Sequence, residues 1–244
     1  MTSYIFQDVE YENIFTLAKI IYKHYDEFAY LLKSDEQLLE FIKDSDVEKY
    51  EKINKLSKLA YPDEVFVFMS SYILNPYMTF RIKNKEFLSY ENIGLDILKS
   101  CPNIDSSLFQ LVQYNLISYQ MEAASFDQKN FKMYEDIKEI ERIEDKQYAY
   151  FKLAYYLSKK DVIVYDKKEY KDIYSFCYYI IKEYADIEAL GNRLSTSAFL
   201  KAYSDYTKDN KSVISYIHIC EELEKNEKKL NDFLERRDEK NYEH

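Results

Sequence analysis

The chain has 244 residues and a formal net charge of −10, and 47% of its residues are hydrophobic while 32% are charged. A chain of this length buries a sizeable core without a metal or a disulfide, and its composition is that of a folded protein. The excess of acids argues against direct binding of DNA or RNA and against docking on an anionic membrane, because both need clustered lysine and arginine. With only two glycines and three prolines, the sequence favours long helices over a fold of many strands.

Helical patterns fill the first part of the chain. Apolar residues recur at helical spacing from 11 to 32. Ser34 and Ser45 each open a sequence with Gln or Glu three residues later, the pattern of a capping box, and predict two further helix starts. Pro62 suits the first turn of the next helix, since its missing N–H would be unpaired there in any case. Pro76 ends that helix, because proline disfavours the helical conformation at the residue before it.

The stretch TFRIKNKEFLS, residues 79–89, has the alternation of a β-hairpin. A two-residue loop at Asn84-Lys85 would pair Ile82 with Phe87 on one face and Lys83 with Glu86 on the other. Each strand then carries one apolar and one charged face. We therefore expect a hairpin here, covered by helices, because an isolated hairpin is marginal in water.

The stretch VIVYDKKEYKD, residues 162–172, repeats this pattern 83 residues later. The same loop position would pair Tyr165 with Tyr170. It would also place Asp166 opposite Glu169, and like charges directly opposite each other are destabilising. We therefore predict a second hairpin whose loop differs from the first.

Two helices are expected after each hairpin, near 90–100 and 106–124 and again near 173–184 and 187–206, with Asp105 as one N-cap. At the offset of 83 residues, apolar positions align, whereas most polar positions between them do not. A duplicated catalytic unit would repeat its polar residues, so we interpret the repeat as duplicated scaffold. The aligned pairs are Tyr72 and Tyr155, Ile93 and Phe176, Ile97 and Ile180, Ile104 and Ile187, Leu111 and Leu194, and Leu116 and Phe199.

These patterns together predict a mainly α fold with minor β (α+β). It would contain two helix–hairpin–helix–helix repeats, a connector helix over 131–157 broken near Asp145, and a long C-terminal helix. The expected segments are 1–61 with the N-terminal helices, 62–125 with the first repeat, 126–207 with the connector and second repeat, and 208–244 with the C-terminal helix. We expect them to form one compact domain.

The last helix, expected over 211–240, carries the candidate binding residues. Tyr216, Ile219 and Leu223 form a dense apolar stripe that suits packing on the body, whereas Leu230 and Phe233 continue it sparsely. Asn226 interrupts the stripe, as in helix pairs of limited strength and chosen register. The predicted partner-binding residues are Tyr216, Leu223, Leu230 and Phe233. Changing Leu230 and Phe233 to Asp should leave the melting temperature almost unchanged and weaken self-association or partner binding.

Motifs for catalysis and for metals are missing from the sequence. Cys101, Cys177 and Cys220 form no CxxC pair, and no Glu-x-x-His sequence accompanies His24 or His218. Two glycines cannot supply a nucleophile elbow, a P-loop or a dinucleotide-binding fingerprint. We assign no catalytic, metal or cofactor residue and expect no cofactor. The N-terminus does not have the pattern of a signal peptide, and the longest apolar run is too short for a membrane span, so we expect a cytoplasmic protein.

The leading hypothesis is a non-enzymatic protein that binds or inhibits another protein through an acidic, tyrosine-rich helical surface. With 27 tyrosines and a negative charge, it fits a partner with a basic surface, as bacterial or phage immunity and anti-defence factors have. One alternative is a metal-dependent hydrolase or nuclease whose carboxylates come from distant helices. Another is an adaptor that forms homo-oligomers through the last helix.

Overall fold

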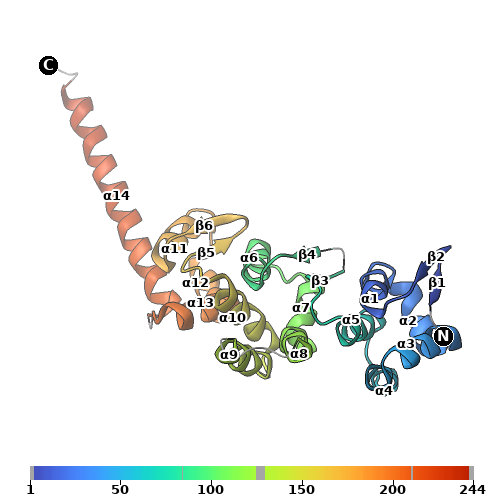
Figure 1. Ribbon diagram of the computed structural model, residues 1–244. Helices are drawn as coiled ribbons and strands as arrows, with labels where there is room; N and C mark the ends of the chain where they lie inside the picture. The colour runs from blue at the N-terminus through green and yellow to red at the C-terminus, as the bar shows by residue number, and fades with distance from the viewer. Residues whose placement is uncertain (1–2, 84, 125–129, 210, 242–244) are drawn as a thin grey trace. The chain divides into compact units, whose positions relative to one another are not determined.

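The computed structural model describes residues 3–241, apart from 84, 125–129 and 210, and in α14 the side chains at 230 and 233–241 also lie outside the description (Figure 1). The described part contains 14 helices and three separate antiparallel pairs of short strands, so the predicted mainly α fold with minor β is confirmed. The first elements are β1 (Tyr4–Phe6), β2 (Val9–Tyr11), α1 (Ile14–Lys23), α2 (Tyr25–Ser34), α3 (Glu36–Ser45), α4 (Val47–Leu56), α5 (Asp63–Leu74), β3 (Phe80–Ile82) and β4 (Lys85–Phe87). They are followed by α6 (Tyr90–Ser100), α7 (Ser106–Gln113), α8 (Leu116–Ala123), α9 (Phe131–Glu141), α10 (Lys146–Ser158), β5 (Ile163–Tyr165), β6 (Lys168–Tyr170), α11 (Ile173–Ile181), α12 (Ile187–Ser195), α13 (Ala198–Thr207) and α14 (Val213–Asn241).

The chain divides into two compact units. The first contains residues 1–93 and 105–150, and the second contains residues 94–104 and 151–244. The boundaries fall inside α6 and α10, so both helices contribute residues to both units. The expected segments of the chain stay a prediction.

In the first unit, α5 is the central helix. The residues of α5 from Val65 to Tyr72, together with Leu74, are buried, as expected for a helix that is apolar on all sides. Helices α1, α2, α4 and α8 all pack against it. The Tyr72 hydroxyl donates to the Thr79 carbonyl at 3.0 Å and accepts from the Arg81 amide at 3.1 Å, which joins α5 to the β3–β4 hairpin.

In the second unit, α11 packs against α14, and the predicted burial of Ile97 and Ile180 is confirmed. Ile97 is fully buried and Ile180 is 1% exposed. Gly94 lies where α6 meets α10, because a Cβ added there would come within 2.5 Å of the Ser158 amide nitrogen. Only a residue without a side chain permits this approach of two backbones.

The two predicted hairpins are present, but their loops lie one residue earlier than expected. Phe80 pairs with Phe87 and Ile82 with Lys85, so Lys85 belongs to the strand and not to the first loop, while the predicted loop residue Asn84 lies outside the described residues. Ile163 pairs with Tyr170, so the second loop is Asp166-Lys167. Both Asp166 and Lys167 have positive φ, at 48° and 64°, which is what a two-residue hairpin loop of type I′ requires. The register keeps the predicted faces, since it differs from the expected one by two residues, and it moves Asp166 away from Glu169.

A third hairpin, β1–β2, was not predicted. Its loop, Gln7-Asp8, again has positive φ at both residues, 51° and 62°. On its inner face the Phe6 ring packs against the Phe28 ring, with 4.6 Å between the centroids. The Tyr4 hydroxyl donates to Asp35 at 3.0 Å. Each of the three hairpins is followed directly by a helix, namely α1, α6 or α11.

Several predicted helix boundaries were wrong. Ser34 and Ser45 do not cap the following helices but end the preceding ones, where their hydroxyls donate back to carbonyls four residues earlier. The caps are instead Asp35 and Asp46, whose shorter path to the free amides gives bonds of 2.9–3.1 Å. The expected cap at Asp105 is confirmed by its bonds to the Ser107 and Leu108 amides.

Three expected single helices are each split in two. The chain turns between α1 and α2 at His24, and between α12 and α13 at Thr196 and Ser197. It turns between α7 and α8 at Asn115, which has φ 55°, a left-handed conformation that asparagine tolerates better than most residues. The break predicted near Asp145 is confirmed between α9 and α10.

Candidate protein-interaction surface

Helix α14 packs through one face on the rest of the second unit. Val213, Ile217 and Cys220 are 7%, 2% and 0% exposed, and their spacing of four and three residues places them on one side of a helix. This side packs on α11 and α12. The Cys220 thiol lies 3.6 Å from the Tyr174 carbonyl, and Ile217 lies against Gly191 of α12.

A second apolar stripe on α14 remains in contact with solvent. Ile219 is 43% exposed and Leu223 is 41% exposed. The prediction that they pack on the rest of the protein is wrong. Helices α11 and α12 contact instead the side of α14 that carries Val213, Ile217 and Cys220, about a quarter turn away. The face that packs on α11 and α12 also has helical apolar spacing in the sequence, at residues 213, 217 and 220. This spacing was the signal available for predicting which side of α14 is buried.

Tyr216 occupies the edge between these two faces. Its side chain is half-buried, and its hydroxyl donates to Asp209 at 2.5 Å. Burial and the Asp209 carboxylate both raise the pKa of the Tyr216 hydroxyl. The tyrosine therefore ties the start of α14 to the preceding loop.

Beyond the body, α14 continues as an exposed helix (Figure 1). Its last hydrogen bond to α11 among the described residues joins the Tyr178 hydroxyl to Glu227 at 2.9 Å. The side chains from Lys225 to Lys229 are all exposed. The predicted contact residues Leu230 and Phe233 belong to α14, but their side chains lie outside the described residues, so their role stays a prediction.

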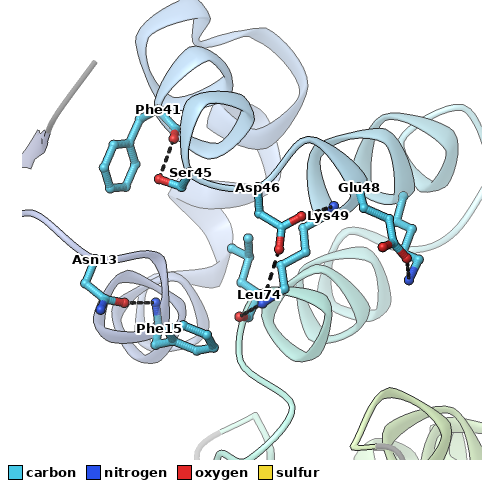
Figure 2. A network of polar contacts seen from close by, with 9 residues as sticks. Asn13, Phe15, Phe41, Ser45, Asp46, Glu48, Lys49 and Leu74 are labelled. Carbon is cyan, nitrogen blue, oxygen red and sulfur yellow. Dashed lines mark hydrogen bonds and ion pairs between the residues drawn. The ribbon is translucent and has the colours of Figure 1, made fainter.

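A polar cleft of about 320 Å³ in the first unit could hold a small ligand, and it lies between α4, α5 and α8. Figure 2 shows the polar network beside it. The Asp46 carboxylate caps α4, and the Lys49 ammonium lies 4.0 Å from it and donates to the Leu74 carbonyl at 2.9 Å. Lys49 thus satisfies a carbonyl at the end of α5, a role that helix ends commonly need.

The other acids of this cleft are also engaged. Glu48 pairs with Lys52 at 2.6 Å, and Glu122 pairs with Lys138 at 2.8 Å and accepts from the Tyr134 hydroxyl. The Lys138 and Tyr134 contacts lower the pKa of Glu122, against the opposing effect of its burial. Within the described residues, no group of three His, Cys, Asp or Glu side chains is placed to hold a metal ion. The network therefore accounts for these charges as helix caps and cross-links.

The most unusual carboxylate is Glu141, which sequence reasoning missed. It is fully buried at the end of α9, where one oxygen accepts from the Ile117 amide at 3.1 Å at the start of α8. Burial is the main cause that raises the pKa of Glu141 to about 7, although the bonds at the start of α8 oppose it. Its position in IKEIERIED resembles that of a surface acid, so no local signal reveals its burial.

The described histidines and cysteines give no further site. His24 lies 3.6 Å from Glu27, and His218 lies 3.2 Å from Glu221, both as surface pairs on one helix turn. The three cysteines are free and buried, and burial raises the pKa of the Cys101 thiol to about 12. Such thiols are poor nucleophiles because the thiolate is the reactive form.

No described helix is both long enough and apolar enough to cross a membrane. No family model, no curated protein and no solved structure matches this chain.

Proposed function

We propose that this chain is a non-enzymatic cytoplasmic protein that acts by binding another protein, and that α14 supplies the contact. The observation that carries the proposal is the exposure of Ile219 and Leu223, one turn apart, on a side of α14 that its own body does not cover. Large aliphatic residues at this spacing are the usual anchors when one helix lies in the groove of a partner. Leu230 follows Leu223 by seven residues, the repeat of a helix–helix contact.

Charge supports a basic partner. The chain carries 44 acids against 34 basic residues. Exposed acids such as Glu222 and Glu227 flank the apolar stripe on α14. Complementary charge speeds the encounter of two proteins, while the apolar anchors supply affinity. A factor that covers a basic surface of its target, as an inhibitor, an immunity protein or an anti-defence protein does, fits this arrangement.

The test compares two doubly substituted full-length proteins with the same change in net charge. The first carries Ile219→Asp and Leu223→Asp. The control carries His218→Asp and Lys225→Gln, whose parent side chains are 70% and 62% exposed and lie on the opposite side of the helix. Each protein is immobilised and incubated with extract of the native host. Bound proteins are then quantified, and melting temperatures are measured in parallel.

We expect a host protein that the wild type and the control capture equally and that the first variant loses by about tenfold or more, since two apolar anchors are replaced by charges. Melting temperatures should agree within a few degrees, because exposed positions contribute little to stability. Equal capture by both variants would refute the role of α14. A large fall in melting temperature only for the first variant would show that the stripe belongs to the core.

A second candidate function is self-association through the same stripe. Asn226 lies between Leu223 and Leu230 at the spacing of a helix–helix contact, and a single polar residue there commonly fixes register and the number of helices. Sedimentation velocity of the wild type and the first variant distinguishes this case. A dimer that the first variant abolishes, together with no captured host protein, would identify a second copy of this chain as the partner.

A further inference from the structure

The three hairpins share one construction. Each pairs three residues with three across a two-residue loop, and each has a glutamate followed by an aromatic residue in its second strand. The middle pair of each hairpin points to the outer face, away from the buried inner face, because side chains alternate along a strand. These outer pairs are Ile5 and Glu10, Arg81 and Glu86, and Val164 and Glu169.

The outer face of β3–β4 faces a helix in the first unit. Arg81 and Glu86, which pair at 2.5 Å, line one side of a cleft of about 200 Å³ together with Thr79. Helix α1 lines the other side with Lys19, Tyr22 and Lys23. Tyr22 is 5% exposed, so the two elements bury it between them and their neighbours.

The outer face of β5–β6 faces a helix in the same way in the second unit. Val164 and Glu169 line one side of a cleft of about 420 Å³ together with Val162. Helix α6 lines the other side with Leu95, Leu98 and Lys99. Leu98 is 1% exposed and Val164 is 6% exposed.

The two clefts use equivalent positions. Along the helices, residues 19, 22 and 23 become 95, 98 and 99 at an offset of 76, and along the hairpins 79, 81 and 86 become 162, 164 and 169 at an offset of 83. Both helices present a large apolar residue followed directly by lysine, Tyr22-Lys23 and Leu98-Lys99. The same arrangement, a hairpin opposite the helix that follows the previous hairpin in the chain, therefore occurs twice, as in stacked repeats that cover their neighbours.

The outer face of β1–β2 is open. Ile5 is 65% exposed, whereas Val164 at the equivalent position is 6% exposed. The Ser3 hydroxyl donates to Glu10 at 2.5 Å and holds that carboxylate beside Ile5. Asp8 and Glu12 are exposed nearby and add negative charge. This face has the aliphatic residue and the glutamate of the covered β5–β6 face, without the cover.

We propose that the outer face of β1–β2, centred on Ile5 and Glu10, binds a helix of another protein that presents a large apolar residue followed directly by lysine. Helix α6 is the template, because Val164 and Glu169 opposite it match Ile5 and Glu10 in chemistry and register. The apolar residue of the partner covers Ile5, and its lysine lies within reach of the acids around Glu10. This surface is separate from the stripe on α14.

The helices of this chain that match the template favour another protein over a second copy as the occupant. In the described chain, each helix that directly follows a hairpin contains or ends at a large apolar residue followed by lysine. In all three the apolar residue is buried within the chain itself. Tyr22 faces β3–β4 and Leu98 faces β5–β6, and Ile181, before Lys182, is 3% exposed. In α11 the neighbouring Tyr178 hydroxyl is bound to Glu227 of α14. None of these three helices has this face free, so we place the partner helix in another protein.

The test uses the full chain and a labelled peptide with the sequence of α6, residues 90–100. A hydrocarbon staple between positions 93 and 97, opposite the contact residues, keeps the peptide helical, since a free helix of this length is marginal in water. Binding is followed by fluorescence anisotropy with protein up to about 1 mM. The variant Ile5→Asp is compared with Leu88→Asp, which places the same charge at a residue that is 86% exposed near the second hairpin.

We expect saturable binding to the wild type and to Leu88→Asp, and binding at least about tenfold weaker to Ile5→Asp. Glu10→Lys should weaken the same peptide and should prefer a peptide carrying Lys99→Glu, so the reversed pair remains informative if Ile5→Asp unfolds the hairpin. The α14 variant Ile219→Asp with Leu223→Asp should bind the peptide like the wild type. The proposal would be overturned if the wild type showed no saturable binding, or if Ile5→Asp and Glu10→Lys both bound the α6 peptide as tightly as the wild type.

Discussion

The β1–β2 and β5–β6 hairpins have the same length, register and loop, but opposite surroundings. Both place an aliphatic residue opposite a glutamate, yet Val164 is 6% exposed and Ile5 is 65% exposed. The difference lies in α6, which covers Val164. A hairpin is thus specified by its own eight residues, whereas the burial or exposure of its outer face depends on an element elsewhere in the chain. Substitutions in the covering helix and in the two hairpins separate these two contributions.

The largest effect should come from the core of the covering helix. Ile97 of α6 is fully buried, and Ile180 of α11 is 1% exposed at the equivalent position. Either one changed to Ala should lower the free energy of unfolding by about 2–5 kcal/mol, because apolar burial is lost and a cavity remains. Urea unfolding measures this change. A loss well below this range at Ile97 would mean that α6 is not fixed over the β5–β6 hairpin.

A smaller effect on the free energy of unfolding is expected from the close packing of α6 on α10 at Gly94. A Cβ at Gly94 would lie 2.5 Å from the Ser158 nitrogen and 2.7 Å from the Ala154 oxygen, both backbone atoms that cannot move alone. Gly94→Ala should therefore cost about 1–3 kcal/mol by overpacking. Gly191→Ala is the matched control, since its nearest neighbour is a side-chain carbon at 3.4 Å, and removing a helical glycine should stabilise by up to about 1 kcal/mol. Thermal unfolding that ranks the two variants in the reverse order would contradict this packing.

The smallest effect compares the two hairpins directly. Val164→Ala should lower the free energy of unfolding by about 1–2 kcal/mol, since two buried methyl groups are lost. Ile5→Ala should change it by less than about 0.5 kcal/mol, because an exposed side chain contributes little. Both are read from urea unfolding curves with the slope held fixed. Equal losses at the two sites would show that β1–β2 is covered in solution, contrary to its described surface.

Sequence reasoning located two of the hairpins because alternation and helix starts are local signals. It placed their loops one residue late, because no glycine marks the positions with positive φ and Asp166-Lys167 adopt them without one. It missed β1–β2 since YIFQDVEY lacks both a glycine and an asparagine, although the glutamate–aromatic pair of Glu10 and Tyr11 recurs at Glu86 and Glu169. That pair, with its fixed distance to the next helix, was the available signal.

The contact surfaces were harder to predict than the elements that carry them. The length of α14 follows from its pattern, but the choice between its two apolar stripes depends on α11 and α12. The sequence favours the stripe of Ile219 and Leu223 as the docking side, whereas the face that packs on α11 and α12 carries Ile217 and Cys220. Two stripes on one helix look alike in sequence, and only the opposing surface decides which of them is buried.

Buried Glu141 couples the folding of the first unit to the uptake of a proton. Its pKa of about 7 in the folded chain lies above its ordinary value of 4.5, so between these values the folded state holds a proton that the unfolded chain has released. This group therefore makes the free energy of unfolding fall as the pH rises from about 4.5 to 7, and its effect levels off above that range. Near pH 7, folding should take up about half a proton at this site. The calorimetric heat of unfolding should then differ between phosphate and Tris in proportion to their ionisation enthalpies, and Glu141→Gln should remove that share of the difference.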